Sequence, residues 1–347
     1  MIQPMPKDIY KSEYDYAIPE ELIAKFPPKN RVDSKLLSYS GKKFNIDPFK
    51  VIPKFFQEDD LIVFNETKVF KARLLLTKES GGKVEIFINK IRNKFEAICL
   101  TKGLNLKKKK QLLKTEKFPL KIVILHNENS LVHIKFNQNI DALCESIGHV
   151  PIPPYLNRTD QEDDKDRYQT VFANHKFIES AAAPTASLHF DEELFNSIRK
   201  NLNTCKISLA VGLGTFKPLS DKPITESSTL HDEDFFISDE AAQLINKQIQ
   251  NSKRIVSIGT TTLRALEAAW CKKQNMVKAG KNTTNIFIKE GYEFNVVNSL
   301  VTNFHLPQSS LLMLVSAFSG KEFILSAYKH AIEKKLRFFS YGDAMII

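Results

Sequence analysis

The order of strand-like and helix-like segments most constrains how this chain folds. From about residue 180 onward, short apolar runs typical of buried strands alternate with amphipathic stretches typical of helices. Ser238 and Ser309 stand where N-cap residues are expected. This alternation predicts a layered α/β domain. The predicted strands cover residues 207–211, 254–258, 296–302 and 337–341, and the predicted helices cover residues 191–200, 238–250, 262–272, 309–318 and 321–335.

A segment with a different pattern precedes that alternation. It contains four short β-type runs, and residues 127–130 favour a tight turn between the last two. Residues 68–148 are therefore predicted to form a small all-β domain. Three prolines between Pro151 and Pro154 forbid both a helix and a central strand, so a connection between domains is expected there. The four runs cover residues 84–88, 95–100, 121–126 and 131–136.

The α/β domain is predicted to begin before this all-β segment. Residues 61–64 form an apolar run like the later strands, which indicates one discontinuous α/β domain of residues 1–67 and 149–347 with residues 68–148 inserted into it. Two domains also suit the length of 347 residues, because a single hydrophobic core usually stops growing at a smaller size. The acidic stretch 160–166 favours a helix start just ahead of Tyr168.

The positive charge of the chain is concentrated in the predicted insert. Between Lys68 and Glu145 there are 17 Lys and Arg against 7 Asp and Glu, whereas the rest of the chain has 33 of each. The formal net charge of +10 therefore comes from this segment. Such an excess is expected of a protein that binds a phosphate backbone, and a solvated lysine-rich surface is the alternative.

Several classes of protein are disfavoured by what the sequence lacks. Residues 1–16 contain no apolar stretch behind a basic start, and the longest apolar run, 311–318, is too short to span a bilayer. A cytoplasmic protein without a membrane segment is therefore expected. The four cysteines are scattered and form no CxxC pair, so neither a metal site nor a disulfide framework is predicted.

Candidate chemistry gathers at the ends of the predicted strands. Gly259 ends one strand and is followed by three threonines, so free backbone N–H groups and hydroxyls would converge on an anionic or polar ligand. Capping threonines and a surface pair between Arg264 and Glu267 are the alternative. Residues 183–190, 211–216 and 302–307 likewise place small or polar side chains where strands end or helices begin.

The histidines and the last carboxylate are ambiguous by themselves. His189 and His305 each suit either acid-base chemistry or a structural hydrogen bond. Asp343 follows Gly342 and suits a base, a group that orients a ring nitrogen, or a turn residue. Gly212 and Gly214 are too few for a dinucleotide fingerprint, which disfavours a nicotinamide enzyme.

Taken together, these segments resemble the S-adenosylmethionine:tRNA ribosyltransferase-isomerase family of queuosine biosynthesis. The resemblance covers nearly the whole chain and implies an α/β domain that carries an inserted β-barrel-like domain. The segments that carry it are YDY at 14–16, PEELIA at 19–24, DLIVFNETKV at 60–69, ARL at 72–74, GHVP at 148–151, YQTV at 168–171, APTA at 183–186, LHF at 188–190, GLGTF at 212–216, GTT at 259–261, VTNFHLP at 301–307, LLMLVSAF at 311–318 and FFSYGDAM at 338–345.

The resemblance implies an unusual use of S-adenosylmethionine. Its ribosyl portion is transferred to the aminomethyl group of 7-aminomethyl-7-deazaguanine at the wobble position of tRNA and is rearranged to an epoxycyclopentanediol. Adenine and methionine leave, and the product is epoxyqueuosine. S-adenosylmethionine is thus expected as a co-substrate without a metal, and the protein is expected to act as a monomer on tRNA that carries this base.

The resemblance also directs the choice of site residues. The predicted acid-base residues are His189, His305 and Asp343. The residues predicted to hold S-adenosylmethionine are Thr185, Gly212, Gly214, Thr215, Phe216, Gly259, Thr260, Thr261, Arg264, Glu267 and Asn303. The residues predicted to face RNA are Lys68, Lys71, Arg73, Lys107 and Lys108.

Three positions depart from the family pattern, and they keep an alternative open. The family usually has histidine where Ala210 stands, glycine where Ser187 stands, and a second histidine where Ser228 precedes His231. A divergent paralogue that binds RNA with lost or altered catalysis is therefore one alternative. An S-adenosylmethionine-dependent RNA methyltransferase is another, although the glycine-rich turn and the acidic strand end of that class are missing.

Overall fold

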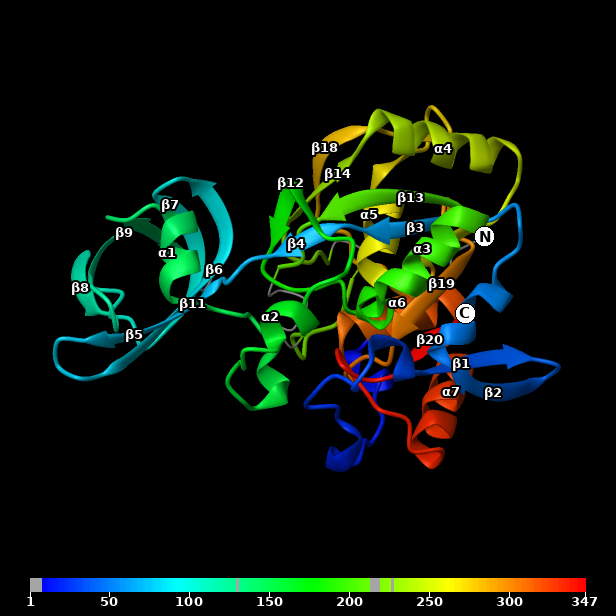
Figure 1. The fold of residues 1–347 in the computed structure, drawn as a ribbon, viewed down its shortest axis with the longest axis horizontal. Helices are drawn as coiled ribbons and strands as arrows, with labels where there is room; N and C mark the ends of the chain where they lie inside the picture. The colour runs from blue at the N-terminus through cyan, green and yellow to red at the C-terminus, as the bar shows by residue number, and fades with distance from the viewer. Residues whose placement is uncertain (1–7, 129–130, 213–218, 226–227) are drawn as a thin grey trace.

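The computed structural model describes residues 8–128, 131–212, 219–225 and 228–347, without the side chains of residues 175–179. Two bodies are visible in Figure 1: a small barrel, and a larger layered α/β body that contains both ends of the described chain. The fold class predicted from the sequence is confirmed.

A nine-stranded mixed sheet forms the centre of the larger body. Its four middle strands, β13, β3, β15 and β19, are mutually parallel. β3 precedes the barrel in the chain but lies between two strands that follow it, so the barrel interrupts one sheet. The order across the sheet is β18 (Gly280–Thr284), β14 (Glu233–Ile237), β13 (Asn203–Leu209), β3 (Leu61–Asn65), β15 (Ile255–Ile258), β19 (Ser299–Asn303), β20 (Ala344–Ile346), β1 (Lys35–Ser40) and β2 (Lys43–Pro48).

Helices cover both faces of this sheet because β3 is apolar on both sides. Leu61 and Val63 pack in a cluster with residues of α4, α5, α6 and α7, whereas Ile62 and Phe64 pack in another cluster with residues of α3. As predicted, Ser238 caps α4 and Ser309 caps α6 through their side chains. These helices are α3 (Glu192–Asn201), α4 (Asp239–Gln250), α5 (Thr260–Ala269), α6 (Ser310–Ser319) and α7 (Lys321–Glu333).

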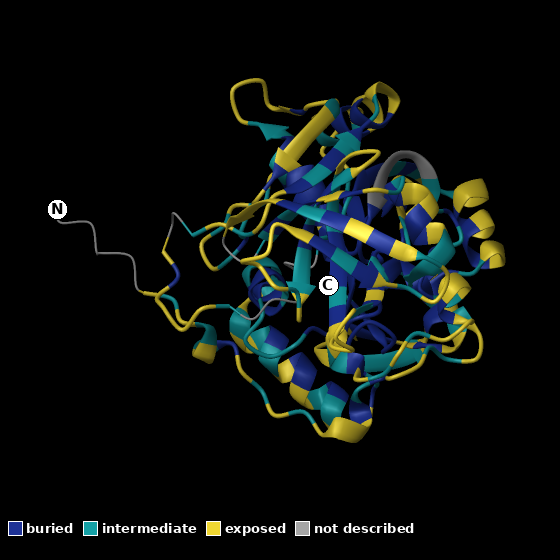
Figure 2. Cartoon of the chain, turned by 90° about the vertical axis from the view of Figure 1, so that its left-hand side faces the viewer, coloured by how far each residue is buried: buried dark blue, intermediate teal, exposed yellow. Residues whose placement is uncertain are grey.

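The smaller body is a closed antiparallel barrel of six strands. Pairing of Thr77 in β5 with Lys114 in β8 joins the first strand of the barrel to the last and so removes both sheet edges. Buried and exposed residues alternate along the barrel strands, which face the viewer in Figure 2. The order is β5 (Arg73–Lys78), β6 (Lys83–Asn93), β7 (Glu96–Lys102), β10 (Leu131–Phe136), β9 (Pro119–Glu128) and β8 (Lys110–Lys114).

The all-β segment also contains one helix, α1 (Ile140–Ile147), which the sequence pattern did not predict. Asn139 caps it, and Ile140, Leu143 and Cys144 pack into the barrel core. β11 (Gly148–His149) then pairs with β5, and the proline-rich connection leads back to the α/β body. Two small pairs complete the strands: β4 (Thr67–Val69) with β12 (Asn174–Ser180), and β16 (Trp270–Cys271) with β17 (Met276–Val277).

One predicted element is wrong. Residues 337–341 do not form the last strand, because the backbone turns at Phe339, whose φ is 69°, and the strand β20 follows at Ala344–Ile346. The helix start predicted in the acidic stretch 160–166 is present, as the four-residue α2 (Asp164–Arg167), which ends at Tyr168. Half of the predicted turn at 127–130 lies outside the described residues.

Within the described ranges, no single helix is long and apolar enough to cross a membrane, although α6 and α7 together pass that test across a bend of 113°.

Candidate active site

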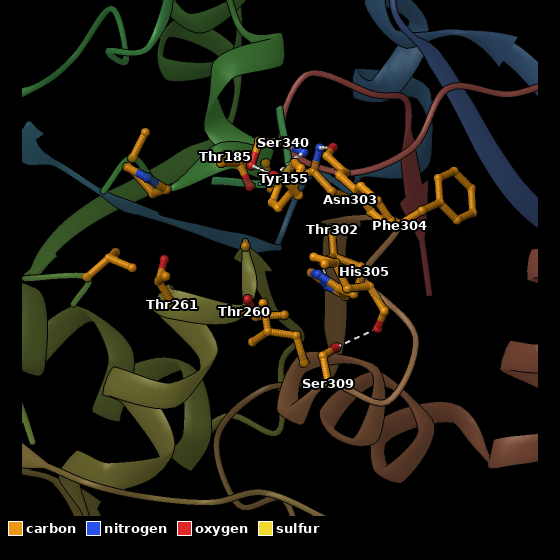
Figure 3. Close-up of a pocket in the computed structure, with 18 residues that line it drawn as sticks. Tyr155, Thr185, Thr260, Thr261, Thr302, Asn303, Phe304, His305, Ser309 and Ser340 are labelled. Carbon is orange, nitrogen blue, oxygen red and sulfur yellow. Dashed lines mark hydrogen bonds between the residues drawn. The ribbon is translucent and has the colours of Figure 1, made fainter. Parts of the chain in front are cut away.

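A small cavity of about 50 Å³, partly open to solvent, lies where β13, β15 and β19 end (Figure 3). The carboxyl ends of parallel strands are the usual place for a ligand in such sheets. Hydroxyl groups and apolar side chains line the cavity, and among its described lining residues there is no Asp, Glu, Lys or Arg. The hydroxyl-bearing residues are Tyr155, Thr185, Thr260, Thr261, Thr302, Ser309 and Ser340.

The N-terminus of α5 opens onto this cavity, as the sequence predicted for the turn at Gly259. Gly259 has φ 91° and ψ 151°, a conformation that essentially only glycine adopts, and a Cβ there would lie 3.5 Å from Cβ of Ala186. The N–H groups of the first helical turn have no carbonyl partner within the helix. Thr260 and Thr261 both line the cavity, and Asn65 Nδ2 donates to Thr261 Oγ1 at 3.3 Å.

His305 lines the cavity and is rigidly held. Its backbone N–H donates to the Tyr328 hydroxyl at 2.8 Å, and its carbonyl accepts from the Tyr16 hydroxyl. Its Nε2 lies 2.8 Å from Thr302 Oγ1. Burial lowers the pKa of His305 to about 3, so the imidazole is neutral near pH 7.

His189 lies behind the cavity wall and not in it. Its ring is buried against Phe49, and its Nε2 and Nδ1 lie 3.1 Å from Asn303 Nδ2 and 3.0 Å from Ser34 Oγ. Asn303 Oδ1 in turn lies 2.9 Å from Thr185 Oγ1. Burial, with a smaller contribution from Arg337 and Arg31, lowers the pKa of His189 to about 3. The structure thus brings Thr185 and Asn303 to the cavity, with His189 supporting them.

A turn that the sequence pattern mistook for a strand forms another wall of the cavity. The rings of Tyr155 and Phe339 meet edge to face at 5.1 Å, and the Tyr155 hydroxyl bonds to Ser340. Phe339 has a positive φ of 69°, which is rare for an aromatic residue. Asn303 Nδ2 donates to the Phe339 carbonyl at 3.2 Å and holds this turn against the end of β19.

Asp343 holds the same turn from the other side. Its carboxylate accepts from the N–H groups of Lys35 at 2.8 Å and Arg337 at 2.7 Å, and it does not line the cavity. Burial raises the pKa of Asp343, although both hydrogen bonds oppose that shift. Of the three predicted acid-base residues, the structure places only His305 in the cavity.

Arg264 and Glu267 do not pair with each other. Arg264 Nη1 lies 2.5 Å from Glu233 Oε2, whereas Glu267 accepts from the backbone N–H groups of residues 295–297 and anchors that loop. Neither residue lines the cavity. Their contacts are those of framework groups, although they remain on the helix that carries Thr260 and Thr261.

A second cleft, of about 290 Å³, separates the barrel from the α/β body. Ala210 and Gly212, at the end of β13, line it, while Val211 between them lines the cavity. Gly212 N–H donates to Glu233 Oε1 at 3.1 Å, and Lys90 of the barrel pairs with Asp234 at 2.7 Å across the cleft. The cavity and the cleft therefore flank one stretch of backbone. Gly214, Thr215 and Phe216 lie outside the described residues.

The predicted RNA-facing residues divide into two groups. Lys71 Nζ lies 2.9 Å from Glu145, and Arg73 Nε lies 2.6 Å from Glu85, so neighbouring carboxylates neutralise both cations. Lys68, Lys107 and Lys108 are exposed. Figure 1 places β8, which follows Lys107 and Lys108 in the chain, on the side of the barrel away from the α/β body.

Sequence reasoning missed Tyr155, Ser340 and Glu233. Tyr155 directly follows the proline-rich connection, and Ser340 lies within the segment 337–341 that is predicted to be a strand. Glu233 follows Asp232 in an ordinary acidic pair, and only the fold places it beside Arg264. Within the described ranges, no cluster of three or more His, Cys, Asp or Glu suits a metal ion.

Comparison with known proteins decides the family. The family model described as "Queuosine biosynthesis protein" matches residues 11–347. The chain belongs to that family. A curated relative from Acinetobacter baumannii, named S-adenosylmethionine:tRNA ribosyltransferase-isomerase, is 42% identical over 338 residues, which are 97% of this chain and 98% of the relative. A family member of the same name from Sulfurihydrogenibium sp. is 42% identical over 343 residues, covering 97% of this chain and 99% of its own.

One solved structure of the family also matches. It is the crystal structure of an S-adenosylmethionine tRNA ribosyltransferase from Thermotoga maritima, with a TM-score of 0.53 and 29% sequence identity. The match covers 97% of this chain and 100% of that one, so the large sheet and the inserted barrel are both included in the comparison.

Proposed function

We propose that this protein is an S-adenosylmethionine:tRNA ribosyltransferase-isomerase that acts on 7-aminomethyl-7-deazaguanine at the tRNA wobble position, releases adenine and methionine, and leaves epoxyqueuosine. The observation that carries the proposal is a hydroxyl-lined cavity, without Asp, Glu, Lys or Arg among its described lining residues, at the carboxyl ends of the parallel strands beside a basic barrel, in a chain of this family. The cytoplasm as its compartment and a monomeric state stay predictions.

The chemistry of the cavity suits the adenosyl part of S-adenosylmethionine. An adenosyl group is a flat aromatic base joined to a ribose whose polar atoms are neutral. The cavity offers the rings of Tyr155 and Phe339 and the hydroxyls of Thr185, Thr260 and Thr302. Because no Asp, Glu, Lys or Arg stands among the described lining residues, aromatic contacts and neutral hydrogen bonds would supply the binding affinity for this group.

His305 is the residue we assign to proton transfer. The positively charged sulfonium acidifies the neighbouring C5′ hydrogens, and a base must remove one of them before the ribosyl group rearranges. His305 is a neutral imidazole on the cavity wall, and no other imidazole and no carboxylate stands among the described lining residues. His189 and Asp343 act on the cavity through the residues that they hold.

The tRNA would approach through the cleft between the two bodies. Lys90 and the end of β13 line this cleft, so a wobble base inserted there would lie next to the backbone stretch that borders the cavity. Lys107 and Lys108, which precede β8 on the side of the barrel away from the α/β body, would contact a part of the RNA backbone that extends beyond this cleft.

The three departures from the family pattern leave the cavity intact. Ser187 is buried outside the cavity lining, Ser228 bonds back to the Thr225 carbonyl, and Ala210 lies in the cleft. None of the three lines the cavity. The relatives favour neither a paralogue that has lost this catalysis nor a methyltransferase.

One reaction separates the three functions. The protein is incubated with S-adenosylmethionine and tRNA that carries the aminomethyl base, and free adenine, methionine and S-adenosylhomocysteine are quantified. Equal amounts of adenine and methionine are expected. S-adenosylhomocysteine would identify a methyltransferase, and tRNA binding without any turnover would identify the catalytically inactive paralogue.

The assignment of His305 has its own control. His305→Gln is expected to lower kcat at least 100-fold with little change in the dissociation constant for tRNA, because general-base catalysis typically contributes that much. His330→Gln, on α7 and outside the cavity, is expected to retain full kcat. Near-normal kcat for His305→Gln would contradict the assignment.

A further inference from the structure

The hydrogen-bond network behind the cavity has only one consistent placement of protons. It runs from Ser34 through His189 and Asn303 to Thr185. The starting point is the Phe339 carbonyl, which is only an acceptor and lies 3.2 Å from the side chain of Asn303. The atom of Asn303 that faces this carbonyl must therefore be the amide nitrogen.

The orientation of Asn303 fixes the tautomer of His189. Because the same amide nitrogen lies 3.1 Å from His189 Nε2, it donates to that nitrogen, and Nε2 must be unprotonated. The ring proton is then on Nδ1 and is donated to Ser34 Oγ at 3.0 Å. Ser34 directs its own hydroxyl proton to the Arg31 carbonyl at 3.4 Å. Each donor in this part of the network has an acceptor.

The same argument fixes the direction of the hydroxyl proton of Thr185, on the cavity side of the network. Asn303 Oδ1 can only accept, so the Thr185 hydroxyl at 2.9 Å must donate its single proton to it. Thr185 Oγ1 then has only lone pairs left for any other partner. Thr185 is half-buried and lines the cavity, whereas Asn303 and His189 are almost completely buried. Figure 3 shows Thr185 and Asn303 side by side on this wall.

We propose that Thr185 is a specificity-determining acceptor for a neutral N–H or O–H donor of the adenosyl group, and that His189 is a positioning residue that fixes its polarity. The neutral donors of that group are the amino group of adenine and the two ribose hydroxyls. The cavity has no carboxylate among its described lining residues, which favours these donors over the ammonium of the methionine portion. The inference rests on the proposed function.

The decisive experiment is a binding comparison that needs no turnover. Dissociation constants are measured by calorimetry for S-adenosylmethionine and for three analogues that lack the 6-amino group, the 2′-hydroxyl or the 3′-hydroxyl. They are measured for the wild type, for Thr185→Val, which keeps the shape but loses the acceptor, and for Thr185→Ser, which keeps the acceptor. Circular dichroism and thermal unfolding confirm that each variant is folded.

The expected pattern is specific to a direct contact. Thr185→Val should weaken S-adenosylmethionine binding about tenfold, and Thr185→Ser should remain within about threefold of the wild type. One of the three analogues should bind the wild type and Thr185→Val with equal affinity. This analogue lacks the donor that contacts Thr185, so the substitution removes no hydrogen bond from its complex. An equal loss for S-adenosylmethionine and all three analogues, or no loss for any, would overturn the contact.

The role of His189 is read from its tautomer. In protein labelled with ¹⁵N-histidine, the His189 signals, assigned by their loss in His189→Gln, should show a protonated Nδ1 and an unprotonated Nε2 at pH 7. A protonated Nε2 would overturn the proton placement. A wild type that binds none of the four compounds would instead overturn the proposed function, while the tautomer would still report on the network.

Discussion

Arg264 on α5 and Glu233 at the start of β14 form a buried ion pair. Arg264 Nη1 lies 2.5 Å from Glu233 Oε2, and less than 5% of either side chain is exposed. The other oxygen of Glu233 accepts from the backbone N–H of Gly212 at 3.1 Å. A single carboxylate thus ties the helix that borders the cavity to the backbone that separates the cavity from the cleft.

Breaking this pair should destabilise the protein strongly. Glu233→Ala leaves the Arg264 guanidinium buried without its carboxylate, which typically costs about 3–5 kcal/mol of unfolding free energy. Urea unfolding measures the loss. The exposed ion pair between Lys253 and Asp59 is the control, because Asp59→Asn should change the unfolding free energy little. Replacing both partners, as Glu233→Leu with Arg264→Met, should recover much of the stability, and a double variant as unstable as Glu233→Ala would contradict this account.

Gly259→Ala should damage binding as well as stability. Its φ of 91° and ψ of 151° are unfavourable for any residue with a Cβ, which should cost about 1–3 kcal/mol. Relief of that strain would move the first turn of α5, so the KM for S-adenosylmethionine should rise. Gly41→Ala is the matched control: its φ is 59° and nothing lies within 4 Å of the added Cβ. It should lower stability and leave KM unchanged, whereas equal KM changes in both variants would argue against a role for the α5 terminus.

Stability should fall as the pH drops below about 6.5. Burial lowers the pKa of both His189 and His305 to about 3 in the folded protein, whereas the unfolded chain titrates near 6.5. Between these values the unfolded state binds more protons, so the stabilisation is complete above pH 6.5 and is lost toward pH 3. Each histidine should contribute a slope that approaches about 1.4 kcal/mol of unfolding free energy per pH unit.

Urea unfolding at pH 7.5, 6.5 and 5.5 tests this pH dependence, and His305→Gln should reduce the slope. An unfolding free energy that does not change with pH would show that the two imidazoles accept protons while the protein stays folded.

Binding of tRNA should depend more on exposed lysines of the barrel than on paired ones. The double variant Lys107→Gln with Lys108→Gln should weaken tRNA binding and lower the slope of log K against log salt by on the order of one unit per lysine, because each phosphate contact releases counterions. Filter binding over a series of salt concentrations measures both. Lys71→Gln is the comparison, since Glu145 already neutralises Lys71. A larger loss for Lys71→Gln than for the double variant would show that the RNA does not extend to the side of the barrel that carries Lys107 and Lys108.

Some parts of this protein follow from local sequence. Apolar runs at 61–64, 207–211 and 254–258 gave the central strands because these strands are buried on both faces, and the N-caps at Ser238 and Ser309 involve only the next few residues. The β-type runs likewise predicted the inserted all-β body. Ligands usually bind at the carboxyl ends of parallel strands, and this tendency correctly placed Thr260, Asn303 and His305 at a common cavity.

The tertiary structure alone decided what each candidate residue contacts. His189 and Asp343 carry groups suited to catalysis, but one supports Asn303 from behind and the other clamps a turn. Pairing of β5 with β8, which closes the barrel, joins residues far apart in the chain. The sequence by itself determined the central strands, most of the helices and the edge where the site forms, because periodicity and capping act over a few residues. Which side chain enters the cavity depends on contacts between distant segments, and that information exists only once the chain has folded.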